Sequence, residues 1–151
     1  MVKILMHGCN GKMGRMITEI VKNEEDAVIA AGVDKFTGIP NDYPVFEEIT
    51  QCDVDVDVVI DFSNAKAVDE LLNYCGEKKL PLVLCTTGLS EDQLAKVTET
   101  SKETAILKSA NMSLGINTLL KLLQDAAKVL AAAGFDMEIV ERHHNLKVDA
   151  P

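Results

Sequence analysis

The sequence predicts an α/β fold built on a doubly wound parallel sheet, followed by the first helix and strand of an α+β domain. Three observations support this prediction. A glycine-bearing turn joins an apolar strand to an amphipathic helix within residues 1–21. The apolar stripe of this helix is expected to consist of Met13, Met16, Ile17, Ile20 and Val21. An acidic residue directly follows a second apolar run. Further short apolar runs alternate with helical patterns, as in parallel sheets, at 56–60, 80–84 and 104–108.

The glycine turn suggests a ligand. Gly8 suits the tight turn, Gly11 a close approach by an anionic group, and Gly14 close helix–strand packing. The unpaired N–H groups at the start of the helix suit a pyrophosphate. The spacing is G-x-x-G-x-x-G rather than the common G-x-G-x-x-G, and such a triplet can also be a plain turn. Asp34, at the end of the strand 27–33, stands where Rossmann-type folds bind the ribose hydroxyls of a nicotinamide cofactor. We therefore favour a dinucleotide site.

The residue after Asp34 leaves the choice of cofactor open. Asp34 favours the ribose hydroxyls of NADH, whereas Lys35 could meet the 2′-phosphate of NADPH. An exposed lysine in a loop is more often only solvated. Together the two residues suit an enzyme that tolerates both NADH and NADPH.

Composition excludes several classes of function. A net charge of −9 argues against nucleic-acid binding, because no broad basic surface could neutralise phosphates. No apolar run approaches the length of a membrane span. The four cysteines form no C-x-x-C pair, so we expect them to be ordinary buried thiols. A reduced, cytoplasmic protein is the simplest interpretation.

Three strands end in small or hydroxyl-bearing loops: DFS at 61–63, CTTG at 85–88 and SANM at 109–112. Taken singly, each is more often a turn or a helix cap. Taken together, they would open on the same edge of a parallel sheet as the glycine turn, where they could hold the nicotinamide carboxamide. Helices are expected after them, capped by Ser63 or Asn64 and by a Ser90–Gln93 capping box.

The pattern changes after residue 112. Ser113 is expected to cap a long helix that ends at Gly134, and residues 135–139 alternate like a half-buried strand. We therefore expect a dinucleotide-binding domain over 1–112 and the incomplete start of a substrate-binding domain over 113–151. One helix and one strand cannot bury themselves as a domain.

A cationic cluster, ERHHNLK at 141–147, contains two of the three histidines. Histidine titrates near neutral pH and can deliver a proton, and a nearby lysine can bind a carboxylate. The alternative to a catalytic role is a polar edge strand whose charged side chains are only solvated. A metal site is disfavoured, because adjacent histidines point to opposite faces and no third ligand is evident.

With these residues in view, the sequence resembles the 4-hydroxy-tetrahydrodipicolinate reductases, also called dihydrodipicolinate reductases. The segments that match the family are GCNGKMGRM, DFS, CTTG, SANMSLGIN and ERHHNLKVDAP, so the resemblance runs from end to end. It implies an enzyme of diaminopimelate and lysine biosynthesis. The implied reaction is an NADH- or NADPH-dependent reduction of the cyclic imine 4-hydroxy-tetrahydrodipicolinate, a dicarboxylate, to tetrahydrodipicolinate.

The resemblance also implies residue roles. By motif position His143 is the acid/base histidine, Lys147 the catalytic lysine and His144 a substrate-binding histidine. The implied cofactor contacts are Gly8, Cys9, Asn10, Gly11, Lys12, Met13, Asp34, Cys85, Thr86, Thr87, Ser109, Ala110, Asn111 and Met112. Lys35, beside Asp34, and Phe62, in the DFS strand end, are expected to contact the cofactor as well. No metal is implied, and a homotetramer is expected for the full-length protein.

The sequence departs from the family pattern in two ways. Cys85 stands where a glycine is expected and would narrow the space beside the cofactor. The family motif continues past KVDAP into a Ser-Gly-Thr segment that grips the substrate carboxylates, whereas this sequence ends at Pro151. We therefore expect a chain truncated within the substrate domain, with bound cofactor but little or no turnover.

Two alternatives remain. One is a different NAD(P)-dependent oxidoreductase with the same first half, which the HHNLK and DAP segments argue against. The other is a non-catalytic domain that senses nicotinamide nucleotides, which would leave the histidine and lysine cluster without a purpose.

Overall fold

A computed structural model describes residues 1–140 and residue 142. The chain divides into two compact units, Met1–Ala110 and Asn111–Pro151. Among the described residues, no helix is both long and apolar enough to cross a membrane.

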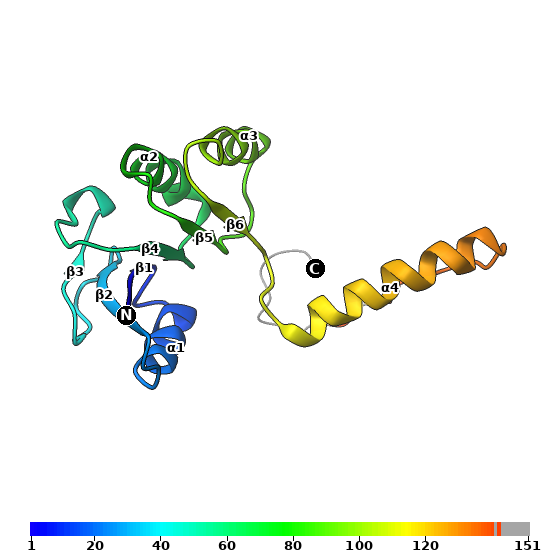
Figure 1. Ribbon diagram of the computed structural model, residues 1–151, viewed down its shortest axis with the longest axis horizontal. Coiled ribbons are helices and arrows are strands. Elements are labelled where there is room, and N and C mark those ends of the chain that lie inside the picture. The colour runs from blue at the N-terminus through cyan, green and yellow to red at the C-terminus, as the bar shows by residue number, and fades with distance from the viewer. Residues whose placement is uncertain (141, 143–151) are drawn as a thin grey trace. The chain divides into compact units, whose positions relative to one another are not determined.

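The first unit is built on a six-stranded sheet in the order β3-β2-β1-β4-β5-β6 (Figure 1). Every neighbouring pair of strands is parallel. The chain runs outward from β1 to β3 and then returns to add β4 on the other side of β1. This reversal creates a topological switch point between β1 and β4, where open α/β sheets bind ligands. The strands are β1 (Val2–His7), β2 (Ala27–Val33), β3 (Val45–Phe46), β4 (Val58–Asp61), β5 (Leu82–Leu84) and β6 (Ile106–Lys108).

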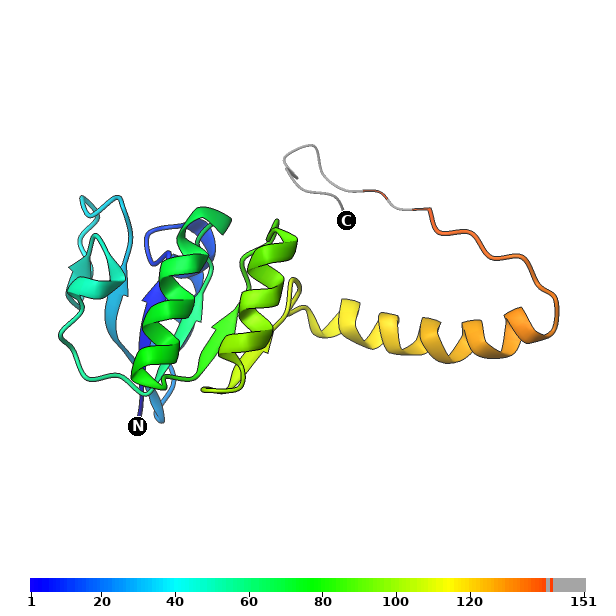
Figure 2. The same cartoon turned by 90° about the horizontal axis from the view of Figure 1, so that it is seen from above.

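Helices cover both faces of this sheet, so the predicted doubly wound fold is confirmed. Helix α1 (Lys12–Val21) lies on one face, and α2 (Val68–Lys78) and α3 (Glu91–Thr100) lie on the other (Figure 1). Figure 2 shows α2 and α3 side by side, and they contact each other. Two short 3₁₀ helices, η1 (Ile49–Gln51) and η2 (Ala65–Ala67), precede β4 and α2.

The core lies in two layers because successive strand residues point to opposite faces of the sheet. On the α2 side, Leu5 of β1 packs with Val59 of β4 and Leu71 of α2, all fully buried. On the α1 side, Ile4 and Met6 of the same strand form a smaller cluster.

Helix α1 departs from the predicted apolar stripe. Its buried residues are Gly14 and Thr18, because Gly14 brings the helix backbone against the glycine turn. Ile17 and Val21 of the stripe pack partly buried against the core. The other members of the stripe are exposed, namely Met13, Met16 and Ile20.

The sequence predicted helix caps more accurately than it predicted where strands begin. The Ser90–Gln93 capping box forms, and Asn64, rather than Ser63, caps the 3₁₀ turn that leads into α2. Strands β4, β5 and β6 each begin two residues later than predicted. The two-residue strand β3 and the 3₁₀ helix η1 were not predicted.

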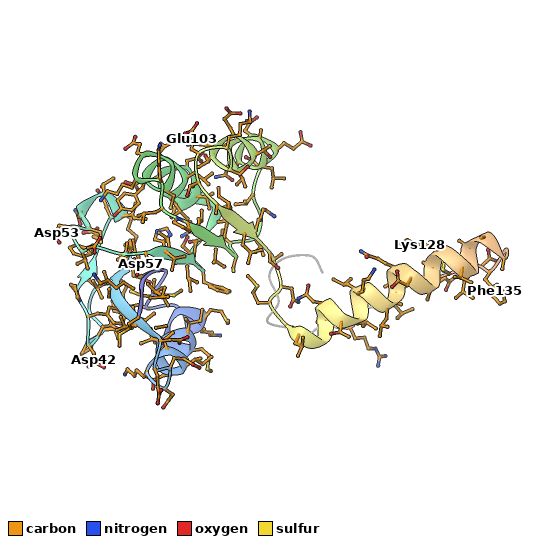
Figure 3. All side chains as sticks on the ribbon, viewed as in Figure 1. Asp42, Asp53, Asp57, Glu103, Lys128 and Phe135 are labelled. Carbon is orange, nitrogen blue, oxygen red and sulfur yellow. The ribbon has the colours of Figure 1, made fainter. Side chains whose placement is uncertain are left out.

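In the second unit, helix α4 (Leu114–Ala132) begins at the predicted cap, where Ser113 Oγ accepts a hydrogen bond from the Ile116 amide. It ends before Gly134, whose φ of +83° is the left-handed conformation typical of helix C-termini. Helix α4 contains no buried residue. Figure 3 shows its side chains, among them Lys128, and Phe135 beyond its end.

The strand predicted over 135–139 is wrong. Residues 135–140 have no regular secondary structure and are exposed. A strand is stabilised by hydrogen bonds to a neighbouring strand, and the described part of this unit contains no other strand.

Candidate functional site

The glycine turn connects β1 to α1 at the carboxyl edge of the sheet. Gly8 has φ +80°, and a Cβ added there would lie 2.6 Å from the carbonyl oxygen of Phe62. The amides of Gly8 and Cys9 both donate to the carbonyl oxygen of Val33, at 2.8 Å and 3.3 Å. The turn is thus fixed between the ends of β2 and β4, and Gly8 is needed by the fold itself.

The other two glycines differ from each other. A Cβ added at Gly14 would overlap the carbonyl oxygen of Gly8, so the helix packs closely there, but against the glycine turn rather than against a strand as predicted. Gly11 is the N-cap of α1, with φ −67° and ψ 169°, and provides no side-chain cap. The one contact found for a Cβ at Gly11 is the Gly8 carbonyl oxygen, at 3.3 Å. The fold therefore tolerates a side chain at Gly11 more readily than at Gly8 or Gly14. The glycine leaves the helix N-terminus open to an anionic ligand, as a dinucleotide pyrophosphate requires.

Asp34 stands at the end of β2, beside the glycine turn. Its Oδ2 accepts a hydrogen bond from the Asn10 amide at 3.0 Å, and its Oδ1 accepts one from the Phe36 amide at 3.0 Å. The Asn10 side chain extends the link, donating to the Phe36 carbonyl oxygen at 2.6 Å and accepting from Asn41 Nδ2 at 3.0 Å. These bonds fix the carboxylate in place. A carboxylate has about four acceptor sites, so it can still accept bonds from ribose hydroxyls.

A cavity of about 230 Å³ opens beside Gly8, Gly11 and Asp34, at the switch point of the sheet. Its walls come from the ends of β1 and β2, the segment between β3 and η1, and the loop after β4. The remaining residues that line it are His7, Val33, Lys35, Glu47, Glu48, Ile49, Phe62, Ser63, Asn64, Ala67 and Glu70. The cavity has the position and polarity of a site for the adenosine half of a dinucleotide.

A buried polar network lies next to this cavity. Asp61, at the end of β4, is fully buried, and its Oδ1 lies 2.7 Å from Nδ1 of His7, its register partner on β1. The hydroxyls of Ser63 and Thr86 both donate to Asp61, each at 2.6 Å. The network thus joins the ends of β1, β4 and β5.

The Asp61 carboxylate is held ionised. Burial alone would raise the pKa of Asp61, but the hydrogen bond and charge of His7, with the bonds from Ser63 and Thr86, lower it below its usual value. Because both hydroxyl protons point to Asp61, Ser63 and Thr86 can only accept bonds from a ligand. Such acceptors suit the N–H₂ of a carboxamide or a sugar hydroxyl.

Two predicted contacts have thiol side chains directed into the protein. Cys9 is fully buried, and its Sγ would lie 2.6 Å from a Cβ at Gly32. Burial and the nearby charge of Asp34 raise the pKa of Cys9 to about 12. Burial, with the charge of Asp61, raises the pKa of Cys85 to about 11. Neither thiol has the low pKa of a nucleophile. Because the Cys9 side chain is fully buried, any contact of Cys9 with a ligand would be through its backbone.

The remaining predicted cofactor residues are spread along the carboxyl edge and beyond it. Lys12 is exposed and lines a different, open cavity with Arg15 and Lys22. Met13, Thr87 and Ala110 are exposed. The Ser109 amide donates a hydrogen bond to the Leu84 carbonyl oxygen at 3.1 Å.

Asn111 and Met112 belong to the second unit. There, Asn111 Oδ1 accepts a hydrogen bond from the Ser113 amide at the start of α4. The predicted catalytic residues His143 and Lys147, and the predicted substrate-binding residue His144, lie outside the described residues. Among the described residues, no group of three His, Cys, Asp or Glu side chains could hold a metal ion.

Sequence reasoning missed His7, Glu47, Glu48 and Glu70 as residues of the cavity. One signal was available for His7, because it is a polar residue at the carboxyl end of an apolar strand, next to the glycine turn. Its pairing with Asp61 depends on the register between β1 and β4, which no local pattern specifies.

The glycine turn, the acid at the end of β2 and the open switch point define a Rossmann-type domain, a class of fold that binds dinucleotides. Residues 2–112 match the family model described as dihydrodipicolinate reductase, N-terminus, and residues 115–151 match the one described as dihydrodipicolinate reductase, C-terminus. The chain belongs to the dihydrodipicolinate reductase family.

Curated relatives agree with this assignment. The chain is 54% identical over 151 residues to the 4-hydroxy-tetrahydrodipicolinate reductase of Clostridium tetani, covering 100% of this chain and 59% of the relative. It is 51% identical to the enzyme of the same name from Clostridium novyi, covering 100% of this chain and 60% of that protein. The chain therefore spans about three fifths of the length of these relatives.

Solved structures support the fold. The dipicolinate-bound dihydrodipicolinate reductase from Paenisporosarcina sp. TG-14 matches with a TM-score of 0.84 and 26% identity, over 100% of this chain and 61% of that one. The NAD(H)- and scyllo-inositol-bound scyllo-inositol dehydrogenase from Lactobacillus casei matches with a TM-score of 0.58 and 15% identity, over 85% of this chain and 42% of that one. At that identity, the second likeness shows a shared fold alone.

Proposed function

We propose that this chain provides the cofactor domain, residues 1–112, and the start of the substrate domain, residues 113–151, of an NAD(P)H-dependent 4-hydroxy-tetrahydrodipicolinate reductase. The enzyme would reduce the cyclic imine to tetrahydrodipicolinate in the diaminopimelate route to lysine. Family membership supports the reaction. The observation that carries the cofactor site is Gly11, which leaves an uncapped helix N-terminus open at the switch point of the sheet.

The residues present fit a nicotinamide dinucleotide. The N–H groups of the first turn of α1 would bind the pyrophosphate, and Asp34 would accept bonds from the ribose hydroxyls. Phe62, Thr86 and Thr87 would line the site toward the nicotinamide, with Thr86 as an acceptor held by Asp61. When bound, this cofactor supplies a hydride to the substrate ring.

The proton-transfer groups would come from the predicted substrate domain. His143 would donate the accompanying proton, because an imidazole titrates near neutral pH. Lys147 would stabilise the developing charge and hold a substrate carboxylate, and His144 would help to bind the substrate. We further propose that the complete enzyme is a cytoplasmic homotetramer.

Turnover tests the catalytic assignment. In a polypeptide that carries this sequence and a complete substrate lobe, His143→Gln should lower kcat by about 10²-fold, the usual contribution of general acid–base catalysis. His144→Gln should raise KM more than it lowers kcat, because its proposed role is binding. NADH affinity should remain unchanged in both variants, which serves as the internal control.

The alternatives predict different results. A nucleotide-sensing domain would bind NADH or NADPH, but it would show no imine reduction even with the complete substrate lobe. A different oxidoreductase would reduce another substrate and ignore the imine. Normal turnover in the His143→Gln variant would refute His143 as the proton donor.

A further inference from the structure

The cavity beside the glycine turn carries an excess of negative charge. Its lining includes the carboxylates of Asp34, Glu47, Glu48 and Glu70. Among the described residues that line it, Lys35 is the single lysine or arginine. The acids come from separate elements: the end of β2, the segment before η1, and α2.

Lys35 is already partnered. Its Nζ lies 3.5 Å from Oε1 of Glu48, and both side chains are partly or largely exposed. Glu48 is also held by η1, because its side chain accepts a bond from the Gln51 amide while Gln51 Oε1 accepts one from the Glu48 amide at 3.3 Å. The capping box therefore keeps a carboxylate beside Lys35, the lysine of this cavity that a 2′-phosphate could use.

We infer that the cavity selects NADH over NADPH and that Glu48 is a specificity-determining residue. This inference rests on the proposed function, in which the cavity receives the adenosine ribose beside Asp34. The free 2′-hydroxyl of NADH can donate a hydrogen bond to Asp34, whose oxygens are already oriented by two backbone amides. A 2′-phosphate offers no such donor when it is fully ionised, and it brings up to two more negative charges.

The size of the effect follows from the charges. Two unit charges about 4 Å apart in a water-like environment change an equilibrium by about fivefold. Lys35 would gain a phosphate partner, but the phosphate would meet Asp34 and compete with Glu48 for the same ammonium group. Glu47 and Glu70, which line the same cavity, add further negative charge. The balance favours the hydroxyl of NADH by about tenfold or more.

Calorimetric titration of NADH and NADPH into the 151-residue chain at low ionic strength tests the inference. Wild type should bind NADH about tenfold more tightly. Glu48→Gln keeps a carbonyl oxygen for the 3₁₀ cap but removes the charge, so the ratio of NADPH to NADH affinity should rise by about fivefold. Adding Lys35→Ala to Glu48→Gln should cancel this rise. Glu103→Gln, the same change at an exposed acid after α3 (Figure 3), should leave the ratio unchanged.

The outcomes separate this inference from the proposal beneath it. If wild type binds NADPH as tightly as NADH, or more tightly, the cavity does not select NADH. If Glu48→Gln leaves the ratio unchanged, Glu48 is not a specificity-determining residue. If neither nucleotide binds, the proposed cofactor site itself is wrong, and the inference fails with it.

Discussion

Helices α2 and α4 show how differently the two units use an apolar sequence. Helix α2 has 11 residues, of which Val68, Leu71, Leu72, Tyr74 and Cys75 are buried. Helix α4 has 19 residues, is more apolar on average, and buries none. Helix α4 is nevertheless regular and capped by Ser113, whereas the N-cap of α2, Ala67, makes no side-chain hydrogen bond, so helix formation does not require burial. Burial instead requires an opposing surface, which the parallel sheet provides for α2.

The same contrast applies to polar groups. In the first unit, Asp61 binds His7, Ser63 and Thr86 within a buried network. In the second, Asp125 forms ion pairs with Lys121 and Lys128 on the exposed face of α4. Buried pairs are costly to break, whereas exposed pairs contribute little. The difference between the two units can therefore be measured with matched substitutions.

The largest effect is expected at Asp61. Asp61→Asn removes the charge that partners His7 and places amide hydrogens against the donors of Ser63 and Thr86. Breaking a buried pair costs about 3–5 kcal/mol, so the free energy of unfolding in urea should fall by that amount. Asp125→Asn makes the same chemical change on α4 and should cost less than about 1 kcal/mol. Equal losses in the two variants would contradict the distinction between the units.

The Asp61 network should also give a pH dependence. The pKa of Asp61 is lower in the folded chain than in the unfolded chain, where it is about 3.9. As the pH falls below that value, the unfolded state therefore takes up a proton at Asp61 before the folded state does. The stabilisation by Asp61 is therefore complete above about pH 5 and is lost as the pH falls through the folded pKa. The stability difference between wild type and Asp61→Asn should narrow on acidification. A difference that stays constant down to about pH 2 would show that the carboxylate is not the source of the effect.

The next largest change in the free energy of unfolding is expected when one leucine in the first unit is truncated, with a leucine of the second unit as its comparison. Leu71 of α2 is fully buried, and Leu71→Ala should lower the free energy of unfolding by about 2–5 kcal/mol. Leu123 of α4 is 49% exposed, and Leu123→Ala should change it by less than about 0.5 kcal/mol. A large loss at Leu123 would mean that the apolar face of α4 is covered in solution.

The smallest effects are expected at two helix caps. Ser90 and Ser113 both accept a hydrogen bond from the amide three residues on, in α3 and α4 respectively. Ser90→Ala should destabilise the first unit by about 1 kcal/mol, measured by urea unfolding. Ser113→Ala should lower the helical circular dichroism signal while leaving the urea midpoint of the first unit unchanged. A shift of that midpoint by Ser113→Ala would show that the two units unfold together.

Features set by neighbouring residues were predictable from the sequence. The capping box at Ser90, the cap at Ser113 and the glycine turn each depend on residues within a few positions of one another. The doubly wound fold followed from the alternation of apolar runs and helical patterns. Strand β3 was missed because two residues carry too little pattern. The strand expected over 135–139 was wrong because alternating apolar residues indicate that a segment can be a strand, but they do not show that a neighbouring strand is present to pair with it.

The candidate site was only partly predictable for the same reason. The pair His7–Asp61 spans 54 positions of the sequence and forms because β1 and β4 are neighbours in register. Glu48 reaches the cavity through η1, a turn that no local pattern indicated. Helix α1 shows the opposite error: its apolar stripe correctly includes Ile17 and Val21, but the buried face is shifted toward Gly14 and Thr18, which leaves Met16 exposed.

Binding of NADH at Gly11 tests the proposed cofactor site most directly. Gly11→Val places a side chain over the open helix N-terminus at a backbone conformation that valine can adopt, so the melting temperature should change little. NADH affinity, measured by calorimetry on the 151-residue chain, should fall at least about tenfold. Gly115→Val is the matched control, because among the described residues a Cβ at Gly115 would meet Ser113 Oγ alone, at an ordinary van der Waals distance of 3.8 Å. We predict that NADH binds equally to wild type and Gly115→Val and at least about tenfold more weakly to Gly11→Val, whereas equal binding to all three would contradict the site.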